Sequence, residues 1–288
     1  MAIKIAVCNQ KGGVGKTTTA IELAACMKNI GFSVLAIDLD QQCNMTDYIG
    51  AQRSRDNIFS VLKGEISIKD SIQHLTEFDM IPASEALSKA TKELGEAKDV
   101  LMLRKVLTEI NDDYDFIFID NSPARDVLLN MTYVAADYLI IPAVADEGSV
   151  TGIKAIYQDL KGYKDIEWSD ADILGIILTR VEKTGMKEYT LTQIKDLIEN
   201  EFHSKIFIEE IRKSVVADEA KAEGTSMQAG KKHSKPAFDY RNVADLILDI
   251  VVGDGAAPDA SGDISGDTSE NESEEVPVIS GNTNGENS

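Results

Sequence analysis

Residues 9–19 place a glycine-rich turn directly after an apolar run and directly before a helical pattern. The stretch reads Asn-Gln-Lys-Gly-Gly-Val-Gly-Lys-Thr-Thr-Thr and follows the run Ile3–Cys8. Such a turn can aim several backbone N–H groups at one point, and the N-terminus of the next helix adds its dipole. These groups suit a phosphate chain. We therefore expect a buried strand, a phosphate-binding loop and a helix, in that order.

The loop is a variant of the P-loop pattern Gly-x-x-x-x-Gly-Lys-Ser/Thr. The first glycine of that pattern is Gln10 here, and an additional lysine, Lys11, stands near the start of the loop. Lys16 is expected to reach the β- and γ-phosphates, and the Thr17 hydroxyl to hold Mg²⁺. Because Lys16 already serves the chain's own phosphates, Lys11 is a candidate to reach the nucleotide of a second subunit. The loop residues expected to bind the nucleotide are Lys11, Gly12, Gly13, Val14, Gly15, Lys16, Thr17 and Thr18.

The body of the chain alternates short apolar runs with segments of 3.6-residue periodicity. This alternation predicts an α/β fold of the P-loop NTPase kind, a mostly parallel sheet with helices on both faces. Right-handed crossovers then bring the carboxyl ends of the strands to one edge, where ligands bind. The expected strands are 3–8, 33–38, 78–82, 116–120, 138–142, 173–179 and 205–208. The expected helices are 16–30, 100–110, 127–136, 149–161, 189–201 and 243–252.

Carboxylates follow two of the expected strands at this same edge. Asp120 ends an apolar run, and an acid placed there beside a phosphate loop holds Mg²⁺ as a Walker B aspartate. Asp38 and Asp40 are two residues apart, so they share a face wherever the chain is extended. Asp40 lies farther out and is the better candidate to orient the water that attacks the γ-phosphate. Asp38 is instead expected to support the Mg²⁺ shell or to fix the loop.

Composition argues against several classes of protein, among them membrane, secreted and zinc or iron–sulfur proteins. No run of about 18 apolar residues is present, and the N-terminus lacks a signal-peptide pattern, so we expect a cytoplasmic protein without a membrane partner. The three cysteines lack Cys-x-x-Cys spacing, which argues against zinc and iron–sulfur sites. Residues 253–288 hold nine of the chain's acids, no lysine or arginine, and no regular period. We expect a disordered acidic tail there, after a domain of residues 1–252.

These motifs resemble the ParA/Soj family, the deviant-Walker ATPases that partition plasmids and chromosomes and that have MinD as a relative. The resemblance covers about residues 1–250 and rests on Asn9–Thr19, on Asp38–Gln42 and on Tyr-Asp-Phe-Ile-Phe-Ile-Asp at 114–120. It implies slow, Mg²⁺-dependent ATP hydrolysis by an ATP-dependent homodimer. It also implies a ParB-like centromere-binding partner, nonspecific DNA as a further partner, and association with the nucleoid where DNA is bound.

The resemblance also assigns roles to individual residues. Lys11 becomes the lysine that acts across the dimer, and Asp40 becomes the hydrolytic aspartate. The segment that edges the adenine in the family matches 211–214 here, so it adds Arg212, Lys213 and Ser214 to the nucleotide-binding residues. The expected catalytic residues are Lys11, Lys16 and Asp40, and the expected metal-binding residues are Thr17, Asp38 and Asp120.

The chain departs from the family pattern mainly where relatives bind DNA. Val216 stands where relatives often carry an arginine before a Glu-Ala pair, and the arginine expected after the Leu-Thr strand end has only loose substitutes. The runs 231–235 and 212–213 supply cations for a basic patch, with a solvated loop as the alternative. An ATP-dependent regulatory or positioning protein with little DNA binding therefore stays open. The loose substitutes are Arg180, Lys183 and Lys187.

Overall fold

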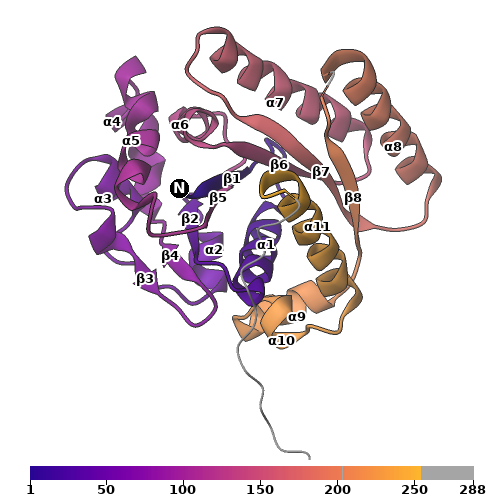
Figure 1. Cartoon of the computed structure of the whole chain (residues 1–288), viewed down its shortest axis with the longest axis horizontal. Helices are drawn as coiled ribbons and strands as arrows, with labels where there is room; N and C mark the ends of the chain where they lie inside the picture. Colours follow the sequence, from indigo (N-terminus) through magenta and orange to yellow (C-terminus); the bar gives the residue numbers. More distant parts are fainter. Residues whose placement is uncertain (203, 254–288) are drawn as a thin grey trace, which may run out of the picture. The chain divides into compact units, whose positions relative to one another are not determined.

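A computed structural model describes residues 1–202 and 204–253, so the expected tail lies outside the described residues apart from Gly253. The strands are β1 (Ile3–Val7), β2 (Val34–Leu39), β3 (Gln73–His74), β4 (Asp79–Ile81), β5 (Phe116–Asn121), β6 (Tyr138–Ala143), β7 (Asp172–Val181) and β8 (Phe207–Arg212). They form one eight-stranded sheet in the order β3-β4-β2-β5-β1-β6-β7-β8 (Figure 1). Every neighbouring pair is parallel except β3 with β4.

Helices connect the strands. The α-helices are α1 (Lys16–Ile30), α2 (Asn44–Tyr48), α3 (Ile58–Leu62), α4 (Ala90–Glu93), α5 (Met102–Leu107), α6 (Val127–Ala135), α7 (Glu147–Asp165), α8 (Gly185–Leu197), α9 (Val216–Glu223), α10 (Met227–Gly230) and α11 (Lys235–Val251). Shorter 3-10 or π segments are η1 (Lys69–Ser71), η2 (Glu85–Lys89), η3 (Ala97–Leu101), η4 (Thr108–Ile110) and η5 (Ile198–Phe202). Within the described residues, no helix has both the length and the apolar character to cross a membrane.

Two apolar cores cover the two faces of the sheet. Alternation along β1 sends Ile5 and Val7 to the core formed with α1, α10 and α11, while Ala6 joins the core formed with α5–α8. The same alternation along β5 sends Phe118 to the first core and Ile119 to the second. Helices therefore lie on both faces of a mostly parallel sheet, which confirms the predicted fold class.

The register of the central strands gathers the motif residues at one edge. Asp120 on β5 is level with Val7 on β1 and with Asp38 on β2. The phosphate loop leaves β1 at the same edge, so the three expected clusters lie next to one another. This confirms the predicted convergence of the three clusters at one edge of the sheet.

Some element boundaries differ from the expectations. β8 covers Phe207–Arg212 instead of 205–208, because an edge strand keeps one side exposed and so tolerates Glu209 and Glu210. The last helix begins at Lys235 instead of 243, after the cap Ser234 and with Pro236 in its first turn. The expected helix at 100–110 is divided among η3, α5 and η4. Helices α9 and α10 were not expected at all, although Gly224 ends α9 in the left-handed conformation typical of a helix stop.

Candidate functional site

The phosphate loop joins β1 to α1 through two glycines in the left-handed conformation. Gly13 has φ 73° and Gly15 has φ 88°, values that a residue with a Cβ adopts only with strain. Gly15 caps α1, so the first free N–H groups of the helix open onto the loop. The Lys16 ammonium donates to the carbonyl oxygen of Lys11 at 3.0 Å, within the curve of the loop. Burial lowers the pKa of Lys16, while Asp120 and Asp40 oppose that shift.

Asp120 lies fully buried beneath this loop. Within the described part of the chain, neither of its carboxylate oxygens has a hydrogen-bond partner. Burial, and then the charge of Asp38, raise the pKa of Asp120 well above its ordinary value. The Thr17 hydroxyl and the Lys16 ammonium oppose this rise without making a hydrogen bond of ordinary geometry. A buried carboxylate without a partner is costly, and a bound cation would offset that cost.

The site fits Mg²⁺ of the kind that is shared with phosphates. Among the described residues, no cluster of three His, Cys, Asp or Glu side chains could hold a metal ion unaided. Mg²⁺ does not require such a cluster, since it is usually held by one or two carboxylates together with substrate phosphates and water. Asp120 with its free oxygens and Thr17 at the start of α1 are the residues suited to it.

Asp38 and Asp40 differ in what their oxygens contact. Asp38 is fully buried and accepts from the Asp40 N–H at 2.9 Å, and from the N–H and hydroxyl of Thr46 at 2.9 and 2.8 Å. Burial raises the pKa of Asp38 to about 6. Because both oxygens of Asp38 are engaged within the protein, its contacts favour fixing the loop over binding the metal directly. Among the described residues, the Asp40 carboxylate accepts only from the Gln42 N–H, at 2.9 Å, through one oxygen.

Lys11 makes an ion pair within its own chain. Its ammonium contacts Asp146, the residue that caps α7 by accepting from the Gly148 N–H and the Ser149 hydroxyl. Although burial would raise the pKa of Asp146, these contacts with Lys11 and Ser149 lower it. The Lys11 and Asp146 side chains are 41% and 40% exposed, so Lys11 can be reached from outside the molecule.

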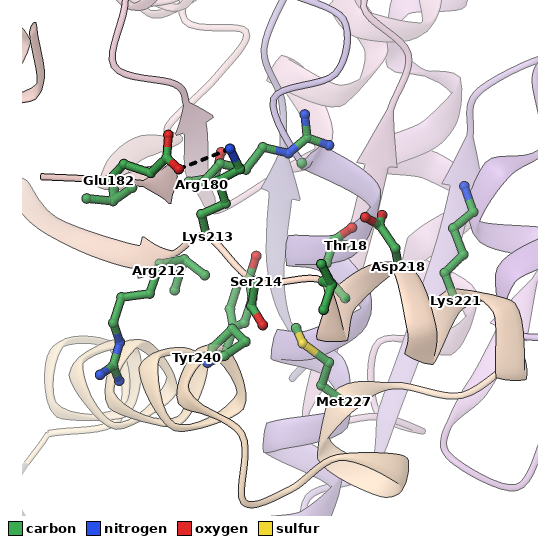
Figure 2. A pocket seen from close by; sticks show the side chains of 17 residues that line it. Thr18, Arg180, Glu182, Arg212, Lys213, Ser214, Asp218, Lys221, Met227 and Tyr240 are labelled. Atoms are coloured by element: carbon green, nitrogen blue, oxygen red, sulfur yellow. Dashed lines mark hydrogen bonds and ion pairs between the residues drawn. The ribbon is translucent and has the colours of Figure 1, made fainter. Parts of the chain in front are cut away.

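A cavity of about 690 Å³ opens beside the phosphate loop. Gly15 and Thr18 line its loop side, and the segment after β8 lines the opposite wall (Figure 2). Its volume suits a nucleotide-sized ligand. All three residues expected beside an adenine, Arg212, Lys213 and Ser214, line this cavity.

The side-chain charges of two of these residues are held by carboxylates. The Arg212 Nε donates to Asp239 on α11 at 2.9 Å, and Lys213 pairs with Glu182 at 3.1 Å. In Figure 2 the Arg212 side chain extends away from Thr18. The expected basic patch is neutralised in a similar way at Lys231, which pairs with Glu219 and Glu223.

Several residues of the site were missed or left without a role by the sequence argument. Asp146 could have been found, because an aspartate followed by a helical pattern after a strand is a helix-cap signal. The cavity residues on α9–α11 carry no local signal, since they lie about 200 residues from the loop in the chain. These residues are Asp218, Lys221, Met227, Pro236 and Tyr240.

Comparison with known proteins gives consistent similarities. A family profile described as an AAA domain matches residues 2–173. The chromosome-partitioning ATPase Soj of Treponema pallidum is 32% identical over 251 residues, which cover 86% of this chain and 96% of that protein. Apo McdA of Cyanothece superposes with a TM-score of 0.76 at 24% identity, over 85% of this chain and 99% of that one. Cobyrinic acid a,c-diamide synthase of Mycobacterium smegmatis, solved with an ATP analogue and magnesium, has a TM-score of 0.75 at 25% identity, over 86% and 95% of the two chains.

Proposed function

The chain belongs to the ParA/Soj family of P-loop NTPases, and on that premise we propose that it is an ATP-dependent dimerisation switch for plasmid or chromosome segregation. In this proposal the protein binds ATP with Mg²⁺, dimerises, and hydrolyses ATP slowly. A ParB-like centromere-binding protein is its partner. It works in the cytoplasm, on the nucleoid where DNA is bound.

One observation carries the proposal. The glycine loop, the unpartnered carboxylate of Asp120 and the outer carboxylate of Asp40 lie at one edge of the sheet, beside a nucleotide-sized cavity. Each group alone has an ordinary structural explanation. Together they form the parts that phosphoryl transfer to water requires: a phosphate cradle, a metal ligand and a group to position the water.

The proposal gives each group of residues at this edge a separate role. The N–H groups of the loop and the Lys16 ammonium hold the phosphates, and Lys16 exchanges the Lys11 carbonyl for phosphate oxygen. Thr17 and Asp120 would hold Mg²⁺, which would supply positive charge to offset that of the phosphates. Asp40 has an oxygen free to accept a hydrogen bond from the attacking water, and Asp38 holds the Asp40 backbone in place.

Dimerisation follows in this proposal from Lys11. A lysine that is 41% exposed at the rim of the loop is available to a second copy of the chain. In the dimer, Lys11 would leave Asp146 and add its charge to the phosphates held by the other subunit, where charge develops during hydrolysis.

The experiment that tests the proposal measures ATP binding, ATP turnover and oligomeric state of the full chain with Mg²⁺. We expect slow turnover and a dimer that forms only with ATP. Lys16→Ala should bind no ATP, because it removes the principal phosphate contact. Asp40→Ala should bind ATP and remain dimeric with little turnover. Failure of the unaltered protein to bind ATP, or normal turnover by Asp40→Ala, would contradict the proposal.

A second candidate function is an ATP-dependent regulatory or positioning switch that binds little DNA. The specific observation in its favour is the pairing of Arg212, Lys213 and Lys231 with carboxylates. Cations already neutralised within the protein release fewer counterions from DNA when they bind it. The two candidates share the ATP cycle and differ only in the partner surface.

A further inference from the structure

β7 carries a bulge at the point where it reaches the nucleotide cavity. Leu178 is level with Glu210 on β8, and the next matched pair is Val181 with Arg212. Thr179 and Arg180 on β7 therefore face the single residue between them on β8. A bulge of this kind redirects a side chain and is common beside binding sites.

Arg180 adopts the left-handed backbone conformation in this bulge, with φ 54°. Only three non-glycine residues among the described ones have positive φ, and Arg180 is the one of them that lines the cavity. For a residue with a Cβ this conformation is strained. Backbone strain that is retained next to a cavity is more typical of a functional position than of an ordinary loop.

The residue before Arg180 ties the bulge to the phosphate loop. The Thr179 hydroxyl lies 2.8 Å from the carbonyl oxygen of Val14 and 3.2 Å from that of Ala143. Gly15 faces the Thr179 side chain closely, since a Cβ on Gly15 would lie 3.4 Å from the Thr179 methyl carbon. Arg180 therefore begins at a place that is held rigidly against the loop.

Arg180 is also one of the two lining cations, with Lys221, that make no ion pair among the described residues. Arg212 and Lys213 are paired with Asp239 and Glu182. Lys221 projects from α9, whereas Arg180 directly follows the residue that is bonded to the phosphate loop. Within the described part of the chain, Arg180 makes no ion pair, and Figure 2 shows its side chain extending from β7 toward the side where Thr18 lies.

From these four observations we propose that Arg180 binds the nucleotide, with its guanidinium contacting the phosphate chain from the cavity side. The inference rests on the proposed function, because it needs a nucleotide in this cavity. It gives Arg180 a role different from that of a DNA contact. It also explains why a strained arginine stands where glycine or asparagine would relieve the backbone.

The test compares three substitutions at Arg180 in the full chain, with ATP and ADP affinities measured by calorimetry. Arg180→Ala should weaken both affinities at least about tenfold, as expected for the loss of a charge-assisted contact. Arg180→Lys should lose less affinity than Arg180→Ala, because lysine keeps the positive charge. The difference between the unaltered protein and Arg180→Ala should shrink as salt is raised.

Arg180→Gly separates a binding role from a structural one. Glycine relieves the left-handed strain, so the thermal midpoint of this variant without nucleotide should rise by about 2–4 °C relative to Arg180→Ala. Its ATP affinity should nevertheless fall as far as that of Arg180→Ala. Unchanged ATP affinity in Arg180→Ala would overturn the inference, as would a loss confined to DNA binding. Absence of ATP binding by the unaltered protein would instead overturn the proposed function.

Discussion

At the scale of single residues, the ion pair between Lys11 and Asp146 is the contact that the proposed dimerisation would exchange. Both side chains are about two-fifths exposed, and pairs of this kind contribute about 0.2–1 kcal/mol. Asp146→Asn removes the charge but keeps a good helix cap for α7. We therefore expect ATP-driven dimerisation to occur at about two- to fivefold lower protein concentration, measured by light scattering across a dilution series. Lys11→Ala is the control and should fail to dimerise; an unchanged midpoint in Asp146→Asn would show that the pair does not restrain Lys11.

A second residue-scale prediction concerns Glu22, which is fully buried on α1. It accepts from the Met227 N–H at 2.7 Å and from the Gln228 amide at 3.1 Å, and burial raises its pKa to about 7. Because this folded-state value lies above the unfolded-state value of about 4.3, the folded chain holds a proton that unfolding releases between these pH values. The free energy of unfolding therefore falls as pH rises through this window.

The measurement is urea unfolding of the unaltered protein and of Glu22→Gln between pH 4 and 8. Between pH 4.5 and 7, the free energy of unfolding of the unaltered protein should fall by about 3 kcal/mol relative to that of Glu22→Gln. Above pH 7 the difference should change no further. Glu109→Gln, at an exposed position, is the matched control. A difference between the two proteins that is constant with pH would mean that Glu22 is ionised in the folded state.

At the scale of elements, the pairing of β7 with β8 depends on a glycine. A Cβ on Gly175 would lie 2.2 Å from two ring carbons of Phe207, a distance that requires the ring to move. Gly175→Ala should destabilise the protein by about 1–3 kcal/mol, measured by chemical unfolding. The double variant Gly175→Ala and Phe207→Ala should be destabilised by less than the sum of the two single destabilisations, because the Phe207 ring that clashes with the new Cβ is removed. Additive effects would contradict this contact.

Long periodic elements were predictable from the sequence, and irregular ones were not. The helix at 16–30 has the bounds expected, because the loop glycines and Gly31 mark its ends. β8 was misplaced, because the polarity of Glu209 reflects an edge position that no local pattern reveals. The start of α11 was also misplaced, although Ser234 and Pro236 supply a local start signal. The bulge at Thr179 and Arg180 was equally invisible, since it exists only in relation to the neighbouring strand.

At the scale of the whole molecule, charge limits the partners. The chain has a formal net charge of −20, and Lys231 of the expected basic patch is paired with Glu219 and Glu223. We expect weak binding to nonspecific duplex DNA with a shallow dependence on salt, measured by fluorescence anisotropy between 50 and 200 mM salt (~tenfold change or less). Glu219→Gln combined with Glu223→Gln should free Lys231 and strengthen this binding.

The matched control uses a similar cluster elsewhere. Lys63 pairs with Glu65 and Glu93, so Glu65→Gln combined with Glu93→Gln frees one cation away from the expected patch. This pair of substitutions should leave DNA binding unchanged if the patch is the relevant surface. Tight, steeply salt-dependent binding by the unaltered protein would instead favour the segregation proposal in its full, DNA-binding form.

The motif residues and the alternation of strands and helices were enough to predict the fold class and the edge of the sheet at which the motif residues gather. This is because the phosphate loop and the carboxylates that follow β2 and β5 are local patterns whose placement follows from parallel strands. The pairing of side chains could not be predicted in the same way. Lys11 with Asp146, Thr179 with Val14 and Arg212 with Asp239 each join segments that are distant in the chain. Which charge is neutralised and which stays available depends on packing between such segments, and the spacing of residues along one segment carries no information about it.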